Sequence, residues 1–147
     1  LAIVISVTQR WAQANNEELN AVASNLQCYC EIHGYSFVSS DLPKRNTIVL
    51  FMSILFKHRS GRYQWVLVLD ADVLVVNLEK SLQRFLSSSE DVLLQMREGG
   101  EVAASSYFLR NSKFSYCFLE LWRAMSPPNR AKTSWVTTPN HDNGDLV

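Results

Sequence analysis

Two aspartates, Asp70 and Asp72, lie within the most hydrophobic part of the chain, "WVLVLDADVLVVN". Charged groups placed beside an apolar core need a compensating interaction. At about 6 Å, two ionised carboxylates repel by roughly 3 kcal/mol at an effective dielectric constant near 20, so a bound cation would relieve the repulsion. A hard divalent cation takes oxygen ligands and commonly brings phosphate oxygens with it. The pair therefore predicts a Mn²⁺ or Mg²⁺ site for a diphosphate. Aspartate is also common in turns, so this motif alone leaves a structural role open.

The elements that would position this pair can be predicted from the hydrophobic pattern. Residues 1–8 and 65–69 are apolar runs of strand length, as expected for strands buried on both faces. Other segments repeat apolar residues at intervals of three and four, which is typical of helices. The predicted strands are 1–8, 35–40, 65–69, 91–96 and 102–110. The predicted helices are 15–33, which Gly34 ends, 47–58, 78–86 and one that Ser112 caps and Pro127 ends.

This alternation predicts a single α/β domain, residues 1–147, with a mainly parallel sheet flanked by helices. In such sheets, ligands bind at the carboxyl ends of the strands. Asp70 and Asp72 follow a central strand, and alternate residues of an extended chain face the same way. We therefore expect both carboxylates to line one site at this edge of the sheet.

The composition excludes several other classes of protein. The chain has 14 basic and 14 acidic residues, so it lacks the positive field on which non-specific nucleic-acid binding depends. Its apolar runs are shorter than the roughly 20 residues that span a bilayer, so we expect a soluble chain. Two of its three cysteines, Cys28 and Cys30, do not have the CxxC spacing of redox and zinc sites. We expect structural thiols, with Cys117 in the core.

Five segments occur in an order that resembles a known family: "YCEIHGYSF", "KRN", "WVLVLDADVLVVN", "SSYFLRNSKFSYCFLELW" and "NHDNGDLV". Together they resemble the GT-A glycosyltransferases of the galactosyl/mannosyl transferase group, glycosyltransferase family 34, and their uncharacterised nucleotide-diphospho-sugar transferase relatives. The resemblance implies a Rossmann-like GT-A fold with a D-x-D site for Mn²⁺ or Mg²⁺. It also implies a retaining hexosyltransferase with a UDP- or GDP-hexose donor and a glycan or glycoprotein acceptor.

The resemblance assigns the donor side of the site residue by residue. It implies that Asp72 binds the metal directly and that Asp70 contacts the metal or the nucleotide ribose, with Ala71 beside them at the donor. The other implied donor contacts are Ser6, Val7 and Thr8 at the nucleobase and ribose, Lys44 and Arg45 at the diphosphate, and Ser105 and Ser106 beside the sugar. Purely structural roles remain open for two of these positions: Ser6 can simply end a strand, and Arg45 can lie in a solvated turn.

The last segment supplies the residues that the resemblance implies near the acceptor. Asp142 matches the acidic residue beside the acceptor or the anomeric carbon, and Asn143 can bond sugar hydroxyls. Gly144 lets the backbone approach closely. Retention can then occur by attack on the same face, with the leaving phosphate accepting the proton, or through a carboxylate nucleophile such as Asp142. The same residues also fit a surface turn.

Two departures from the family pattern concern the whole protein. Family 34 members extend further and supply a late histidine as an additional metal ligand, whereas this chain ends at Val147. We therefore expect a domain truncated at its C-terminus. The membrane anchor implied for an enzyme of the Golgi or secretory lumen also lies outside this chain.

Two alternative functions stay open at this point. The apolar strand ending in Asp-x-Asp also resembles the first motif of haloacid dehalogenase-like phosphatases, with Asp70 as nucleophile and Asp72 as acid/base. That family opens its domain with this strand, whereas 64 residues precede Trp65 here. The other alternative is a degenerate, non-catalytic module that binds a sugar nucleotide or a glycan.

Overall fold

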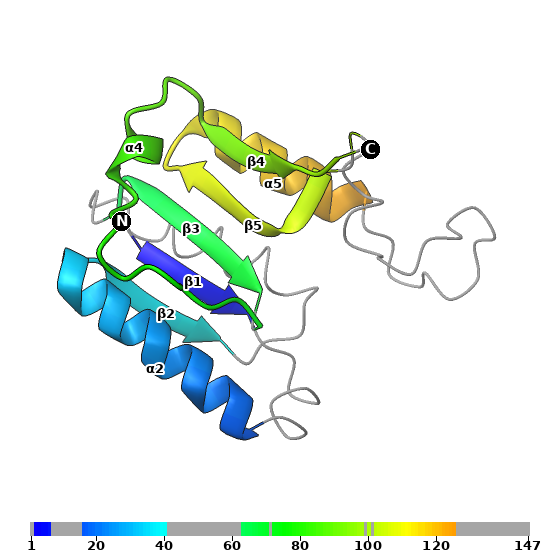
Figure 1. Ribbon diagram of the computed structural model, residues 1–147. Coiled ribbons are helices and arrows are strands. Elements are labelled where there is room, and N and C mark those ends of the chain that lie inside the picture. The colour runs from blue at the N-terminus through cyan, green and yellow to red at the C-terminus, as the bar shows by residue number, and fades with distance from the viewer. Residues whose placement is uncertain are drawn as a thin grey trace, which may run out of the picture.

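The computed structural model describes residues 2–6, 16–40, 63–70, 72–98, 100 and 102–125. In this part of the chain strands and helices are interspersed, which confirms the predicted α/β class (Figure 1). The elements are β1 (Ala2–Ser6), α2 (Asn16–His33), β2 (Ser36–Ser40), β3 (Trp65–Asp70), α4 (Gln83–Leu86), β4 (Val92–Met96), β5 (Val102–Arg110) and α5 (Lys113–Met125). The helix predicted at 47–58 lies outside the described residues.

The five strands form one mixed sheet in the order β2-β1-β3-β5-β4. β1 pairs in parallel with β2 and β3, whereas β5 pairs antiparallel with both β3 and β4. The prediction of a mainly parallel sheet therefore holds for β2, β1 and β3 and is wrong for the two ladders that β5 makes. The connection between β4 and β5, residues 97–101, is too short for the crossover that parallel neighbours need. Gly100, at φ 85°, donates its N–H to Arg97 O at 3.1 Å in this turn.

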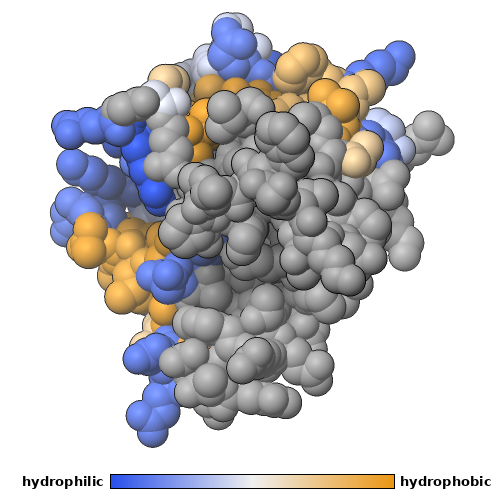
Figure 2. Space-filling view, turned by 90° about the vertical axis from the view of Figure 1, so that its right-hand side faces the viewer, coloured by the Kyte–Doolittle hydropathy of each residue, from blue (hydrophilic) through white to orange (hydrophobic). Residues whose placement is uncertain are grey.

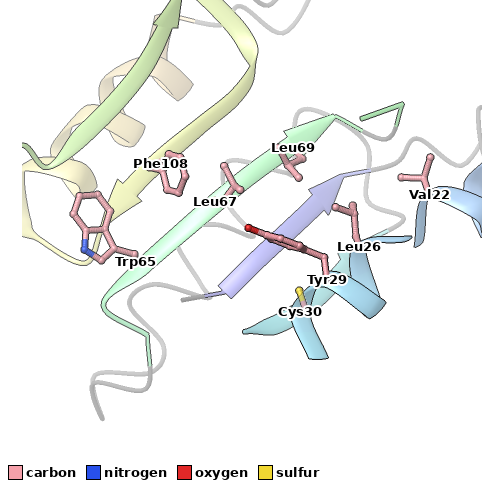
Figure 3. Close-up of a cluster of buried hydrophobic side chains, with 8 residues drawn as sticks. All are labelled: Val22, Leu26, Tyr29, Cys30, Trp65, Leu67, Leu69 and Phe108. Atoms are coloured by element: carbon pink, nitrogen blue, oxygen red, sulfur yellow. The ribbon is translucent and has the colours of Figure 1, made fainter. Parts of the chain in front are cut away.

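The central strand β3 is buried on both faces, as its apolar run predicts. Alternate side chains pack on opposite sides, with α2 covering one face and α5 the other (Figure 1). The α2 face holds Val22, Leu26, Tyr29, Cys30, Trp65, Leu67, Leu69 and Phe108 (Figure 3). The α5 face holds Val66, Val68, Tyr107, Leu109, Leu119 and Trp122. β3 is thus held between two cores.

The C-terminal end of α2 and the N-terminal end of α5 agree with the predictions, whereas the predicted end at Pro127 lies outside the described residues. Gly34 follows α2 with φ 67°, and the N–H of Tyr35 donates to Cys30 O at 2.8 Å. Ser112 caps α5, because its Oγ accepts the N–H of Ser115 at 3.1 Å. Among the described residues, no helix combines the length and the hydropathy needed to cross a membrane.

Two local predictions are wrong. The helix predicted at 78–86 is reduced to α4, because the backbone of residues 78–82 bonds instead to side chains of α2 and to Tyr35. Cys117, predicted for the core, is exposed, because the face of α5 that packs on the sheet carries Leu119 and Trp122. In both places the tertiary contacts, and not the local pattern, decide the outcome.

The three cysteines differ in environment. Cys30 is buried in the core beneath α2, whereas Cys28 and Cys117 are exposed, and all three are free thiols. Burial, together with the nearby Glu31 carboxylate, raises the pKa of the Cys30 thiol to about 11. Because the thiolate is the reactive form, Cys30 should be an inert structural thiol at neutral pH.

We expect iodoacetamide to separate these thiols. At mildly alkaline pH it should label Cys28 and Cys117 readily and Cys30 on the order of 100-fold more slowly, because the buried group stays protonated. Peptide mass mapping after timed labelling of the native protein measures the three rates. The Cys30 rate should rise with pH up to about 11. Equal labelling of all three thiols in the folded chain would contradict the burial of Cys30.

Candidate functional site

Strand register brings three of the predicted site residues to one edge of the sheet. Ser6 at the end of β1 pairs with Asp70 at the end of β3 and with Ser40 at the end of β2. Ser106 of β5 lies opposite Leu69. Because neighbouring strands run about 4.8 Å apart, these positions are close together. The arrowheads of β1, β2 and β3 point to this edge in Figure 1. The predicted location of Asp70 at the carboxyl end of a central strand is therefore confirmed.

The same register divides the residues at this edge between the two faces of the sheet. Asp70 continues the alternation of Val68, which places it on the α5 face, where it is partly buried. Ser106 shares the opposite face with Leu69, and its Oγ lies 3.5 Å from Gln95 Oε1. A ligand can reach both Asp70 and Ser106 only around the end of the sheet.

An irregularity in β5 lies at this edge as well. Leu94 of β4 pairs with Tyr107, but the next residue, Gln95, pairs with Ala103. Residues 104–106 therefore have no counterpart in the β4 ladder. Such bulges bend a strand and redirect its side chains, and they are common next to functional sites. β5 thus departs from β4 where the resemblance implies Ser105 and Ser106 beside a donor sugar.

Beyond Asp70 the chain turns instead of continuing as a strand. The N–H of Val73 donates to Asp70 O at 3.3 Å, which closes a turn over residues 70–73. Asp72 lies in this turn, and its side chain is exposed. Strand alternation, from which we expected the two aspartates to face the same way, therefore does not extend to Asp72. The position of Asp72 therefore depends on this turn and on the contacts of the residues that follow it.

The chain that follows, residues 72–82, packs back against α2 and is called the docked segment here. Val73, Val75 and Leu78 are half-buried and contact the core beneath α2. Leu74 and Val76 alternate with them and are 53% and 98% exposed. Figure 2, which faces the edge toward which β1, β2 and β3 run, shows hydrophobic surface on the left, the side on which α2 lies.

Polar side chains from one face of α2 bind the backbone of the docked segment. Asn25 Nδ2 donates to Val75 O at 3.1 Å, and the N–H of Val75 donates to Asn25 Oδ1 at 2.8 Å. Tyr29 and His33 follow at four-residue spacing. The Tyr29 hydroxyl donates to Lys80 O at 2.6 Å, and His33 Nε2 donates to Leu78 O at 2.8 Å. The N–H of Leu82 donates to the Tyr35 hydroxyl at 3.1 Å.

The donor atoms at the turn fit the predicted chemistry. Carboxylate oxygens are the ligands that a hard divalent cation prefers, and a Mg²⁺-type ion commonly uses one or two carboxylates together with water and phosphate oxygens. Asp70, at the end of β3, and Asp72, in the turn after it, each carry a carboxylate of this kind near a sheet edge. Within the described residues, no group of three or more His, Cys, Asp or Glu side chains is placed to hold a metal ion.

Several predicted site residues lie outside the described part of the chain. They are Val7, Thr8, Lys44, Arg45, Ala71, Asp142, Asn143 and Gly144. Ser6 and Ser105 are placed by the backbone of β1 and β5. The binding and catalytic roles of all these residues stay predictions.

Sequence reasoning did not single out Asn25 and Tyr29. The available signal is the four-residue spacing that these residues share with His33 on one helix. That spacing fits an ordinary packing face equally well. Their partners are backbone groups 45 to 51 residues away, which no side-chain pattern in the docked segment reveals.

Arg110 and Asn111, which belong to the segment "SSYFLRNSKFSYCFLELW" of the resemblance, lie at the opposite edge of the sheet, where Arg110 pairs with Trp65. Asn111 Nδ2 donates to Tyr63 O at 3.2 Å, so it ties β5 to the chain before β3. A cavity of about 430 Å³ at this edge is lined by Tyr63, Gln64, Trp65, Leu86, Arg110 and Asn111. None of the residues predicted to bind the donor lines it.

The Arg110 guanidinium has several structural partners, although its buried Nε makes no hydrogen bond within the described residues. It donates to Ser88 O, its Nε lies 3.7 Å from Asp91 Oδ1, and its Cζ lies 4.8 Å from the centre of the Trp65 ring. The backbone N–H of Arg110 donates to Asp91 O at 2.7 Å. These contacts join the loop before β4 to the end of β5.

We expect Arg110→Met to destabilise the fold by about 1–2 kcal/mol, the combined size of a hydrogen bond and a partly exposed cation–π contact. Chemical denaturation measures this loss. Lys113→Met, which removes an exposed cation three residues further along, serves as the control. The nucleotide binding predicted for the carboxyl edge should be unchanged in folded Arg110→Met. A selective loss of that binding without a loss of stability would contradict the structural assignment of Arg110.

Solved structures of glycosyltransferases share this fold. The "crystal structure of a glycosyltransferase involved in the glycosylation of the major capsid of PBCV-1" has a TM-score of 0.66 at 18% identity, over 95% of this chain and 72% of that chain. The glycosyltransferase GlyE of Streptococcus pneumoniae TIGR4 has a TM-score of 0.52 at 12% identity, over 99% of this chain and 42% of that chain. Its apo form gives 0.54 at 13% identity. The chain therefore has a glycosyltransferase-like fold and spans less than half the length of GlyE.

The chain belongs to the family described as "Protein of unknown function, DUF273", which matches residues 26–134. The matched range contains β3, the turn with Asp72 and the docked segment. Comparison with curated proteins gives no match. The comparisons thus identify a glycosyltransferase-like fold without distinguishing glycosyltransferase family 34.

Proposed function

We propose that this chain is the catalytic domain of a metal-dependent glycosyltransferase that moves a hexose from a UDP- or GDP-sugar to a glycan or protein acceptor. The observation that carries this proposal is the meeting of Ser6, Asp70 and the Asp72 turn at the carboxyl edge of parallel strands. The fold shared with solved glycosyltransferases supports it. Ligands bind at this edge in sheets of this kind.

The donor site would be divided between the first and third strands. Asp72, exposed in its turn, would bind a Mn²⁺ or Mg²⁺ ion, and Asp70 would hold the same ion or the ribose. Ser6, with Val7 and Thr8 after it, would hold the nucleoside. Arg45 would approach the diphosphate. The cation, when bound, lowers the charge on the departing diphosphate.

The sugar would lie toward β5, where Ser105 and Ser106 leave room for it. An acceptor oxygen would form a bond to the anomeric carbon as the bond from that carbon to the diphosphate oxygen breaks, and the hydroxyl proton would pass to the leaving phosphate. Asp142 and Asn143 would bind the acceptor or flank the reacting carbon, and Gly144 would let the backbone approach. The resemblance to family 34 favours retention of configuration, an address in the Golgi or secretory lumen, and a membrane anchor on another part of the protein.

Metal-dependent binding of a sugar nucleotide is the direct test. With Mn²⁺ and a saturating UDP- or GDP-hexose, the apparent stability of the chain should rise by about 2.7 kcal/mol at a ligand concentration of 100 Kd. Thermal unfolding measures this rise, with and without Mn²⁺. Asp72→Asn should lose it. Glu79→Gln, which neutralises another exposed carboxylate of the docked segment, is the matched control and should keep it.

The other outcomes of this test identify the alternatives. Stabilisation without donor hydrolysis or sugar transfer would indicate a degenerate sugar-nucleotide-binding module. Phosphate release from a phosphomonoester that Asp70→Asn abolishes would indicate the haloacid dehalogenase-like phosphatase. No metal-dependent stabilisation by any UDP- or GDP-sugar would refute the proposal.

A further inference from the structure

The docked segment is fixed to α2 at several points, and the first point is closest to the turn. Asn25, Tyr29 and His33 lie one helical turn apart and bind Val75, Lys80 and Leu78 of the segment. These contacts join residues that are 45 to 51 positions apart in the sequence. The helix therefore holds the backbone that follows Asp72 by side-chain hydrogen bonds.

Asn25 makes a two-bond contact with a single residue. Its side-chain amide both donates to Val75 O, at 3.1 Å, and accepts from the N–H of Val75, at 2.8 Å. This is the exchange that two opposed residues make in an antiparallel ladder, with the Asn25 amide in place of one peptide group. Two bonds to one peptide unit fix its orientation as well as its position. The Val75 side chain adds an apolar contact with the core beneath α2.

Asp72 lies between this anchor and the end of β3. Asp70 is held in the sheet by its register with Ser6, and its carbonyl accepts the N–H of Val73. Val75 is held by Asn25. Only residues 71–74 lie between these two fixed points. A chain this short with both ends held has little conformational freedom, so the backbone position from which Asp72 extends its exposed carboxylate is confined.

The remaining contacts act further along the segment. Tyr29 and His33 bind at Lys80 and Leu78, eight and six residues after Asp72. Their rings pack with each other and with Tyr35 at centroid distances of 4.6 to 5.9 Å. They stabilise the segment as a whole, whereas Asn25 alone among the described α2 residues binds backbone adjacent to the turn.

From this geometry we infer that Asn25 is a positioning residue for the metal site: it acts through Val75 to hold the turn in which Asp72 presents its carboxylate to the cation. The inference rests on the proposed function, because it assumes that Asp72 binds a cation. Residues that orient a metal ligand commonly contribute a factor of about 10 to 100 to metal affinity. Asn25 itself touches neither metal nor donor.

The test compares variants that break one contact each. Asn25→Ala removes both bonds to Val75, and Tyr29→Phe removes the bond to Lys80 while keeping the ring. Gln27→Ala removes an exposed side chain of the same helix, which donates a hydrogen bond to Glu31 of α2 and contacts no residue of the docked segment by hydrogen bonds. Asn25→Asp keeps the acceptor for the Val75 N–H and sets a carboxylate against Val75 O, so it supplies a second, isosteric variant if Asn25→Ala folds poorly. Thermal unfolding and circular dichroism establish that each variant is folded.

The readout is the Kd for Mn²⁺ measured by titration calorimetry in the presence of UDP and, separately, of GDP. We expect a weakening of about 10-fold in both Asn25 variants, and Kd values within about 2-fold of the starting protein for Tyr29→Phe and Gln27→Ala. Tyr29→Phe should nevertheless lower the melting temperature, because it loses the partly buried hydrogen bond from the Tyr29 hydroxyl to Lys80 O.

Three results would decide against the inference in different ways. Unchanged Mn²⁺ affinity in the folded Asn25 variants would overturn the positioning role and leave the proposed function standing. An equal loss in Tyr29→Phe would assign the effect to general stability of the segment and also overturn it. A starting protein that binds no Mn²⁺ with either nucleotide would overturn the proposed function itself, and the inference with it.

Discussion

The arrangement of this protein depends on the burial of β3 on both faces. Each of the residues from Trp65 to Leu69 is at most 6% exposed, and each buried apolar side chain contributes about 1.5–3 kcal/mol. A one-residue shift in register would move every side chain to the other face, so two filled cores forbid it. Asp70 is consequently the first residue at which the strand leaves the core, and the apolar packing of the residues before it sets its place beside Ser6 at the edge.

α2 extends this control past the end of the strand. Its apolar side chains cover one face of β3, while Asn25, Tyr29 and His33 bind the backbone of the docked segment. A chain leaving a buried strand would otherwise expose its peptide groups or form its own helix. Here side chains of α2 form hydrogen bonds with several of those peptide groups, and the Val75 side chain packs against the core beneath α2. The same element therefore builds the core and confines the turn that carries Asp72.

The sequence was informative where one local pattern had one physical solution. The continuous apolar run at β3, Gly34 after α2 and the Ser112 cap could each be predicted for this reason. The helix predicted at 78–86 failed because side chains about 50 residues away compete for its backbone groups. The prediction that Cys117 lies in the core failed because α5 carries apolar residues on more than one face. The turn at Asp72 could not be predicted, because the apolar residues after it continue the strand pattern while their contacts lie on α2.

The direction of β5 decides which parts of the motif set can act together. Because β5 runs antiparallel to β3, it begins at the edge with Asp70 and ends at the edge with Trp65. Arg110 lies four positions after Ser106, a distance of about 14 Å along a strand. The guanidinium is moreover engaged with Ser88, Asp91 and the Trp65 ring. One contiguous motif thus serves two ends of the sheet, with chemistry proposed for the small residues at its start and a structural role for the arginine at its end. If β5 ran parallel to β3, Arg110 instead of Ser106 would lie at the edge with Asp70. The direction of the strand, which the local sequence does not encode, therefore determines the roles of these residues.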